Sequence, residues 1–289
     1  MNGSLNEQYE RDGYVALRQL ITPSEVATLR KWLLERLKQA GQPRFLKPGQ
    51  CLELPELCEL PFRERVVDAL KQLAGDDYHQ IGDLHVHHNI YGIWHTEAGP
   101  DGRRRYQLDP GFRVVKCGMY LQDNDGRGGG LTVLRGGHRF PFRAPGVRLP
   151  FHSKALRDAI LRVRGATRLD LAAGDLLLFD FQLPHIATRP LPSHRCHEHK
   201  LAIFFNAARR DSVRPFLKQT ERRALSEETA GGEVYFSDFL HRRFPEDYPA
   251  SYARSARAAG VTIATPTPGD AEHWRSWNDR MCASASRAG

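Results

Sequence analysis

The sequence predicts a mainly β fold, a sandwich or barrel such as a jelly roll, with flanking helices. Between about residues 78 and 210, short runs rich in β-branched and aromatic residues alternate with glycine-rich turns. The segments on either side instead carry apolar residues at helical spacing. No segment repeats and no long low-complexity linker interrupts the chain. We therefore expect a single domain over residues 1–289, with a β core at about 78–210 and a helical C-terminal extension at about 215–285.

The N-terminal part is expected to contain a short strand and two helices. Residues 9–20 indicate a turn and then a strand. The segment Thr22-Pro-Ser-Glu25 is a helix-start signal, because its threonine can cap a helix, its proline suits the first turn and its glutamate can complete a capping box. Apolar spacing predicts amphipathic helices over about 23–40 and 61–75. Neither helix carries an obvious chemical group, so we interpret both as packing elements.

The central and C-terminal elements follow the same two patterns. Strands are expected at residues 84–97, 114–121, 131–134, 173–181 and 200–207, with the glycine-rich turn of residues 122–130 between the second and third. From residue 216 on, helices are expected at about 217–230, 235–243, 249–259 and 269–285, with prolines as breaks between them, Pro215 included.

The composition narrows the classes of function. The net charge is +8, with the densest basic run at Arg103-Arg104-Arg105, but there is no nucleic-acid motif and no interleaving of basic and aromatic residues. We therefore expect no nucleic acid as partner, and we favour a small-molecule substrate, an anionic one. No stretch is long and apolar enough to predict a membrane span or a signal peptide. Five scattered cysteines, an odd number, indicate a reducing compartment, so we expect a cytoplasmic protein.

Two residues of the strand predicted at 84–97 are candidate metal ligands. Residues i and i+2 of a strand point to the same face, so His95 and Glu97 should project side by side. A second histidine would complete the two-histidine, one-carboxylate facial triad of non-heme iron(II) oxygenases. His185 is the best candidate, because it follows the buried strand of residues 173–181 and would lie at the mouth of the barrel, where pockets form.

Four segments in order resemble the phytanoyl-CoA dioxygenase-like (PhyH) branch of the Fe(II)/2-oxoglutarate oxygenases, over roughly residues 8–210. They are the N-terminal strand and helix, Trp94-His95-Thr96-Glu97, the hairpin of residues 118–139, and the segment from Gly174 to His185. The third is similar to the family's hairpin Tyr-Leu-x-Asp followed by Gly-x-Leu-x-Val-x-Pro-Gly-Ser-His-Arg. The 90-residue separation of His95 and His185 is also typical of this family.

The resemblance implies a double-stranded β-helix (a cupin-like jelly roll) and an oxygenase. His95, Glu97 and His185 would bind Fe(II), and 2-oxoglutarate and O2 would be the cosubstrates, with ascorbate as a supporting reductant. Oxidative decarboxylation to succinate and CO2 would drive hydroxylation of a substrate C–H bond, and desaturation, epimerisation or ring formation stay open. The family's substrates suggest a small molecule of secondary metabolism. His138 matches a structural position of the family.

The sequence departs from the family pattern at two places. Glu97 stands where the family usually has aspartate, and a carboxylate there argues against a halogenase, which needs room for halide. The family binds the distal carboxylate of 2-oxoglutarate through an arginine just before the strand that follows the distal histidine. Lys200 holds that place here, and Arg195 is the rival. We favour Lys200 because a strand fixes its direction, although lysine lacks the two-pronged contact of arginine.

Alternative interpretations stay open beside the oxygenase. A zinc-dependent hydrolase, or a jelly-roll metal-binding protein without 2-oxoglutarate chemistry, would use similar residues. Arg103, Arg104 and Arg105 are either a solvated loop or, because they follow two of the candidate ligands closely, contacts for an anionic group of the substrate. The histidines of residues 194–199 do not match the spacing of a standard zinc motif.

Overall fold

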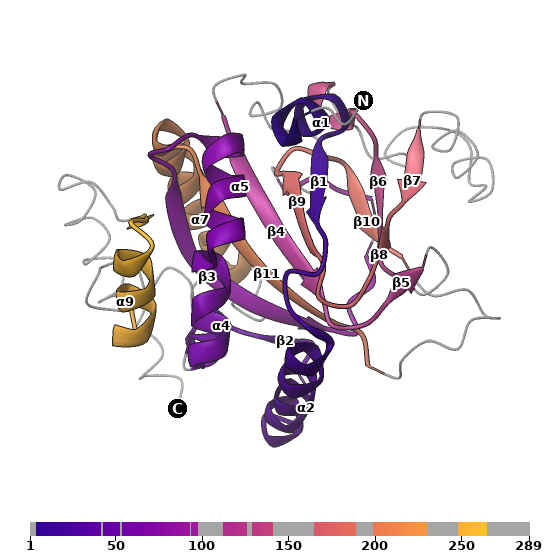
Figure 1. Cartoon of the computed structure of the whole chain (residues 1–289), viewed down its shortest axis with the longest axis vertical. Helices are drawn as coiled ribbons and strands as arrows, with labels where there is room; N and C mark the ends of the chain where they lie inside the picture. The colour runs from indigo at the N-terminus through magenta and orange to yellow at the C-terminus, as the bar shows by residue number, and fades with distance from the viewer. Residues whose placement is uncertain are drawn as a thin grey trace.

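A computed structural model describes the chain over residues 4–41, 43–52, 54–92, 94–97, 112–125, 129–140, 165–188, 199–229 and 248–264 (Figure 1). Within these ranges, none of the helices combines the length and the apolar character needed to span a lipid bilayer. The helices expected at 235–243 and 269–285 lie outside the described residues.

The larger of the sheets has the strand order β1-β9-β4-β11-β3-β12, with β2 paired to β3 as well. All neighbours are antiparallel except β12 and β3. The bounds are β1 Tyr14–Leu17, β2 Phe45–Leu46, β3 His79–His88, β4 Val114–Tyr120, β9 Leu176–Asp180, β11 Leu201–Ala208 and β12 Thr262–Ile263. The three longest strands, β4, β11 and β3, lie next to one another in the middle of this sheet.

A three-stranded sheet, β10-β6-β7, lies beside the large one (Figure 1). Its strands are β6 Leu131–Leu134, β7 Ala166–Arg168 and β10 His185–Ala187, and β5 (Asn124–Asp125) pairs separately with β8 (Asp170–Leu171). A shared core joins the sheets, because Tyr120, Phe179 and Phe204 of the large sheet belong to one buried cluster with Leu131 and Val133 of β6. The predicted fold, a β sandwich with flanking helices, is confirmed.

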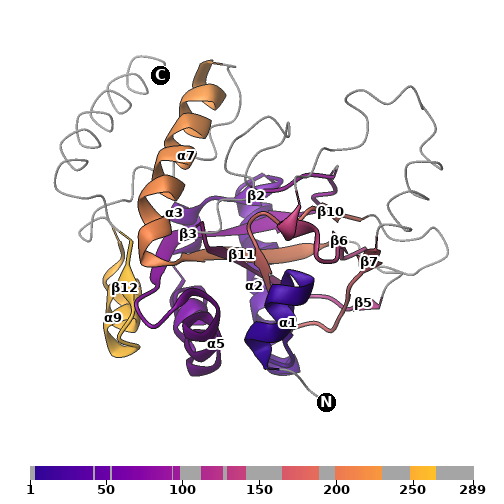
Figure 2. The same ribbon diagram turned by 90° about the horizontal axis from the view of Figure 1, so that it is seen from above.

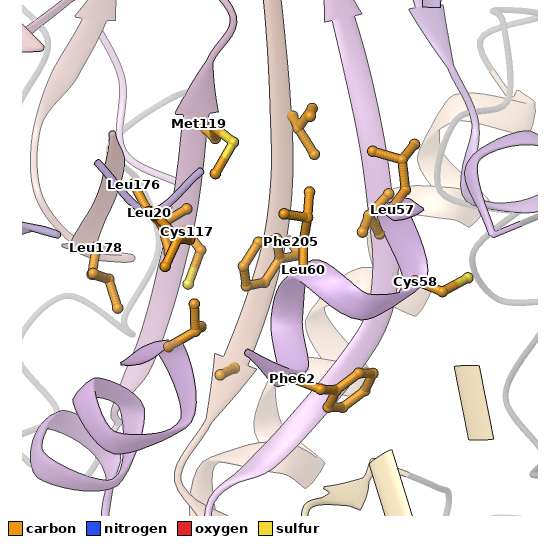
Figure 3. Packing of buried hydrophobic residues seen from close by; sticks show 14 of the residues in the cluster. Leu20, Leu57, Cys58, Leu60, Phe62, Cys117, Met119, Leu176, Leu178 and Phe205 are labelled. Carbon is orange, nitrogen blue, oxygen red and sulfur yellow. The ribbon is translucent and has the colours of Figure 1, made fainter. Parts of the chain in front are cut away.

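The N-terminal helices cover the outer face of the large sheet. They are α1 Leu5–Asp12, α2 Pro23–Gln39, α3 Pro48–Cys51, α4 Pro55–Glu59 and α5 Glu64–Ala74, with the 3-10 turn η1 at Leu60–Phe62. Figure 3 shows Leu60 of this layer beside Phe205 of the sheet, and both belong to one buried cluster with Leu57, Cys117 and Met119. The odd-numbered residues of β4 and β11 pack against these helices. Because side chains alternate along a strand, the even-numbered residues point to the inner face of the sheet.

The C-terminal extension begins with α7 (Arg210–Thr229), which packs on the other side of the sheet from α5 (Figure 2). Val213, Phe216 and Leu217 of α7 are buried against the end of the sheet. The chain then contributes α9 (Ala250–Ala258), close to the helix expected at 249–259. The extension is therefore packed onto the β core through apolar side chains.

The bounds of three elements differ from those expected. The strand predicted at 84–97 ends at His88, because Asn89 has a φ of 51° and turns the chain. Residues 9–20 contain the expected strand, β1, but their first residues belong to α1, which begins with a capping box of Ser4 and Glu7. Pro215 does not precede α7 but lies inside it. The missing N–H removes one helical hydrogen bond near the helix start, and the buried apolar face compensates for that loss.

Gly174 holds the turn that leads into β9, and we expect Gly174→Ala to destabilise the fold. Its φ is +88°, and a Cβ atom there would lie 2.8 Å from the carbonyl oxygen of Ile21. Gly41 is the matched control, because its φ is +77° and nothing lies within 4 Å of its Cβ position. We expect a loss of about 2 kcal/mol in the free energy of unfolding for Gly174→Ala and about 1 kcal/mol for Gly41→Ala, measured by urea denaturation. Equal losses would show that the contact with Ile21 has no effect.

Candidate metal centre

Backbone hydrogen bonds bring the segment of His95 and Glu97 to the segment of His185. His95 and His185 form an isolated antiparallel bridge, in which each backbone N–H donates to the other's carbonyl at 3.0 and 2.9 Å. The N–H of Glu97 donates to the carbonyl of Phe181 at 3.1 Å, just beyond the end of β9. The two segments are 90 residues apart in the sequence, and this pairing fixes the distance between their side chains.

The three side chains point one oxygen and two nitrogens at a common point. The Oε1 atom of Glu97 lies 3.5 Å from Nε2 of His185 and 4.0 Å from Nε2 of His95. Ligand atoms of the three residues all lie within 4.8 Å of one another. A divalent ion with bonds of about 2.1 Å reaches ligand atoms up to about 4.2 Å apart, which covers the two distances from Oε1. Neutral imidazole and carboxylate ligands suit iron(II), among other first-row metals.

His185 is the most firmly oriented of the three. Its side chain is 5% exposed, against 14% for Glu97 and 30% for His95. Its Nδ1 lies 2.9 Å from the carbonyl oxygen of Leu183, and because a carbonyl only accepts, Nδ1 must carry the proton. Nε2, which lies 3.5 Å from Oε1 of Glu97, is then the nitrogen that can bind a metal. This is the arrangement in which proteins hold metal-binding histidines.

A buried lysine contacts the same carboxylate oxygen. Lys116, in the middle of β4, donates a hydrogen bond from Nζ to Oε1 of Glu97. Burial alone would raise the pKa of Glu97, but the Lys116 charge and the two imidazoles outweigh it and hold that pKa well below its usual range. Sequence reasoning missed Lys116, although a single lysine inside the apolar run of residues 114–121 was a visible signal.

The inner face of the large sheet beside Lys116 is unusually polar. His85 and His87 of β3 point inward, and their rings lie 5.7 and 4.9 Å from the ring of Phe204. Burial, with the charge of Lys116 as a smaller cause, lowers the pKa of His85 to about 3. Gly118 leaves the space that Phe204 fills, because a Cβ atom there would lie 2.7 Å from that ring. Burial also lowers the pKa of His87 well below its usual range, so both imidazoles are neutral at physiological pH.

Helix α7 of the C-terminal extension also donates a hydrogen bond to the backbone carbonyl of Glu97. The side-chain amide of Gln219 in α7 donates to the carbonyl oxygen of Glu97 at 3.3 Å. Gln219 is 3% exposed. The first helix of the extension therefore helps to position the Glu97 segment, a role that the helical pattern of the sequence does not reveal.

Lys200 lies at the start of β11, on the inner side. It is 7% exposed, and its Nζ donates to the carbonyl of Gly130 at 3.3 Å and lies 4.9 and 5.4 Å from the ring centres of Tyr91 and Tyr120. Burial lowers the pKa of Lys200 to about 8. Among the described residues, no ion pair is formed by Lys200, so an anion entering this region would meet a cation without a carboxylate partner.

The structure describes only some of the other predicted site residues. Arg195 and the run Arg103, Arg104 and Arg105 lie outside the described residues. The imidazole of His138 lies against the backbone of Gly13 and is not in the ligand group. In the loop of histidines, His199 is described, and its Nδ1 lies 2.9 Å from Nε2 of His88.

Comparison with known proteins identifies a common family. The sequence profile of the phytanoyl-CoA dioxygenase (PhyH) family matches residues 9–191, more than half of the chain. The ectoine dioxygenase of Stutzerimonas stutzeri (strain A1501) is 24% identical over 268 residues, which cover 76% of this chain and 82% of that protein.

Solved structures share the fold. HygX from Streptomyces hygroscopicus, with nickel and 2-oxoglutarate bound, superposes with a TM-score of 0.55 at 17% identity, over 71% of this chain and 86% of that chain. EctD from S. alaskensis, with 2-oxoglutarate and 5-hydroxyectoine, gives a TM-score of 0.54 at 20% identity, over 72% and 76% of the two chains. These likenesses support the jelly-roll fold of the chain.

Proposed function

Because the chain belongs to the phytanoyl-CoA dioxygenase family, we propose that it is an Fe(II)- and 2-oxoglutarate-dependent dioxygenase that hydroxylates an unactivated C–H bond of a small molecule. The observation that carries the proposal is the convergence of His95, Glu97 and His185 on one point. Bound there, iron(II) would supply the oxidative decarboxylation of 2-oxoglutarate with O2, giving succinate and CO2, and the oxidation of the substrate. Ascorbate would keep the iron reduced.

The chain's own residues would orient the reactants and hold the ligands in place. His185 offers Nε2 because its Nδ1 proton is held by Leu183, and the backbone pairing of His95 with His185 keeps the two imidazoles together. The buried rings around the centre, such as Phe179 and Phe204, would exclude water from the reacting atoms. The side chain of Glu97 fills the ligand position, which supports hydroxylation and not halogenation.

We assign the distal carboxylate of 2-oxoglutarate to Lys200. Its buried ammonium, flanked by Tyr91 and Tyr120, would form a charge-assisted pair with that carboxylate in an environment of low dielectric.

The substrate is expected to be a small metabolite of secondary metabolism. The names of the relatives, ectoine dioxygenases, support a small-molecule substrate. The basic balance of the chain favours an anionic one, with Arg103, Arg104 and Arg105 as candidate contacts.

The proposal is tested by supplying Fe(II), 2-oxoglutarate, O2 and ascorbate to the purified protein. We expect succinate to form slowly without a substrate, and 2-oxoglutarate to raise the midpoint of thermal unfolding of the metal-loaded protein. A zinc-dependent hydrolase or a metal-binding protein without this chemistry would give neither result. Absence of both the succinate and the thermal shift would contradict the proposed function.

The affinity for 2-oxoglutarate should weaken at alkaline pH. Only protonated Lys200 can pair with the distal carboxylate, and the pKa of this lysine is lowered to about 8 by burial. The contribution of this ion pair to 2-oxoglutarate affinity is therefore fully present well below the pKa of Lys200 and is lost as the pH rises through it. We expect the dissociation constant to rise about tenfold between pH 7 and pH 9, measured by titration calorimetry on Ni(II)-loaded protein.

Lys200→Arg is the matched control for the pH dependence. Arginine stays protonated throughout this range, so its affinity for 2-oxoglutarate should not change between pH 7 and pH 9. A wild-type dissociation constant that is independent of pH would remove Lys200 from this role.

A further inference from the structure

Lys116 is a buried cation that the family assignment does not explain. Its side chain is 9% exposed, on the inner face of β4, while its neighbours Val115 and Cys117 belong to the outer core. Its Nζ lies 4.9 Å from the ring centre of Phe204 and donates to Oε1 of Glu97. A buried ammonium is tolerated only with a close counter-charge, and Glu97 supplies it here.

The carboxylate oxygen that Lys116 contacts is the one that faces the two imidazoles. The distances from His185 and His95 both end on this Oε1 atom, so it is the carboxylate oxygen placed to join a metal held by the two imidazoles. A divalent ion on Oε1 would repel an ammonium at the same atom. At a separation of a few ångströms this repulsion is large even with protein-like screening. The lysine and the metal therefore compete for one oxygen.

A second buried carboxylate lies within electrostatic reach of Lys116. Asp83 of β3 is 7% exposed, and it accepts hydrogen bonds from the backbone and the side-chain amide of Asn206, the residue that pairs with Lys116 across the sheet. Burial raises the pKa of Asp83, and the Lys116 charge is among the causes that lower it. An ammonium displaced from Glu97 would still have an anion near it.

We propose that Lys116 is a positioning residue that takes the place of the metal: its ammonium neutralises Glu97 before metal binds, and the metal displaces it from Oε1 toward Asp83. This rests on the proposed function only in requiring that the triad binds a divalent metal. In the metal-free protein, Lys116 is the counter-charge of Glu97 and holds its carboxylate beside the two histidines. In the metal-bound protein, the same charge opposes the ion, so Lys116 lowers metal affinity and makes metal binding reversible.

The test is the dissociation constant for Ni(II), measured by titration calorimetry on metal-free protein. We expect Lys116→Met and Lys116→Gln to bind Ni(II) about tenfold or more tightly than wild type, because the competing charge is gone. Lys116→Arg retains the charge and should stay within about threefold of wild type. His138→Ala is the control, because its imidazole lies against Gly13 outside the ligand group, and it should leave Ni(II) affinity unchanged.

Thermal unfolding of the same variants keeps the proposal testable if folding is affected. Lys116→Met leaves Glu97 without this counter-charge, so its metal-free unfolding midpoint should fall and saturating Ni(II) should raise that midpoint more than in wild type. Ni(II) affinity in Lys116→Met that is equal to or weaker than that of wild type would overturn the proposal while leaving the metal site intact. A wild-type protein that binds no Ni(II) would overturn the metal site itself.

Discussion

Replacement of His185 by alanine is expected to abolish binding of Fe(II) and Ni(II), and with it all 2-oxoglutarate turnover. The imidazole of His185 is the most buried of the three candidate ligands and is oriented by the carbonyl of Leu183. Removal of an outer partner of a ligand lowers metal affinity by roughly 10–100-fold, and removal of the ligand itself should exceed that. The measurement is calorimetric titration with Ni(II), followed by the succinate assay with Fe(II).

His138→Ala is the control for this prediction. The imidazole of His138 is half-buried like a ligand but lies against Gly13, outside the metal group, so metal affinity should not change. His185→Gln, which fills the same space, separates loss of the ligand from loss of packing, and it should also fail to bind metal with wild-type affinity. Equal iron affinity in wild type and His185→Ala would remove His185 from the site.

The second large effect is expected at the cosubstrate. Lys200→Ala should weaken 2-oxoglutarate binding by about 100-fold, because a buried charge-assisted hydrogen bond to the distal carboxylate is lost. Lys200→Met, which keeps most of the apolar stem between Tyr91 and Tyr120, should give a similar loss. The measurement is the dissociation constant of 2-oxoglutarate for Ni(II)-loaded protein, with the Ni(II) affinity measured in parallel.

Arg195→Ala distinguishes the two candidate anchors. Arg195 lies outside the described residues, in the segment before Lys200. We expect Arg195→Ala to change 2-oxoglutarate affinity far less than Lys200→Ala. The reverse order would transfer the role to Arg195 and leave Lys200 as a buried structural lysine.

Much of the fold was predictable because local signals and tertiary packing agree. The capping box at Thr22 and the apolar spacing after it predicted α2 nearly to the residue. The glycine-rich turn at residues 122–130 separated β4 from β6 correctly. By contrast, the strand expected through His95 was wrong, because one residue, Asn89, adopts a left-handed conformation that side-chain patterning does not reveal.

The sequence predicted the residues of the candidate site but not the contacts that other side chains make with them. The pair His95 and Glu97 and the distant His185 were identified from spacing and family resemblance, and the structure brings their ligand atoms together. The contacts of Lys116 and Gln219 with Glu97 depend on the register of β4 and on the packing of α7. These contacts form only through tertiary structure, and the periodicity of a single sequence does not predict them.

The most direct test of the account is whether 2-oxoglutarate binding depends on metal held by the three residues. Calorimetric titration of 2-oxoglutarate should be compared in metal-free protein, in Ni(II)-loaded protein and in His95→Ala with the same Ni(II) supplied. We expect Ni(II) to tighten binding in the wild type by about tenfold or more, because chelation to the ion adds to the pair with Lys200, and we expect no such gain in His95→Ala. An affinity for 2-oxoglutarate that is the same with and without Ni(II) would contradict the assignment of this centre.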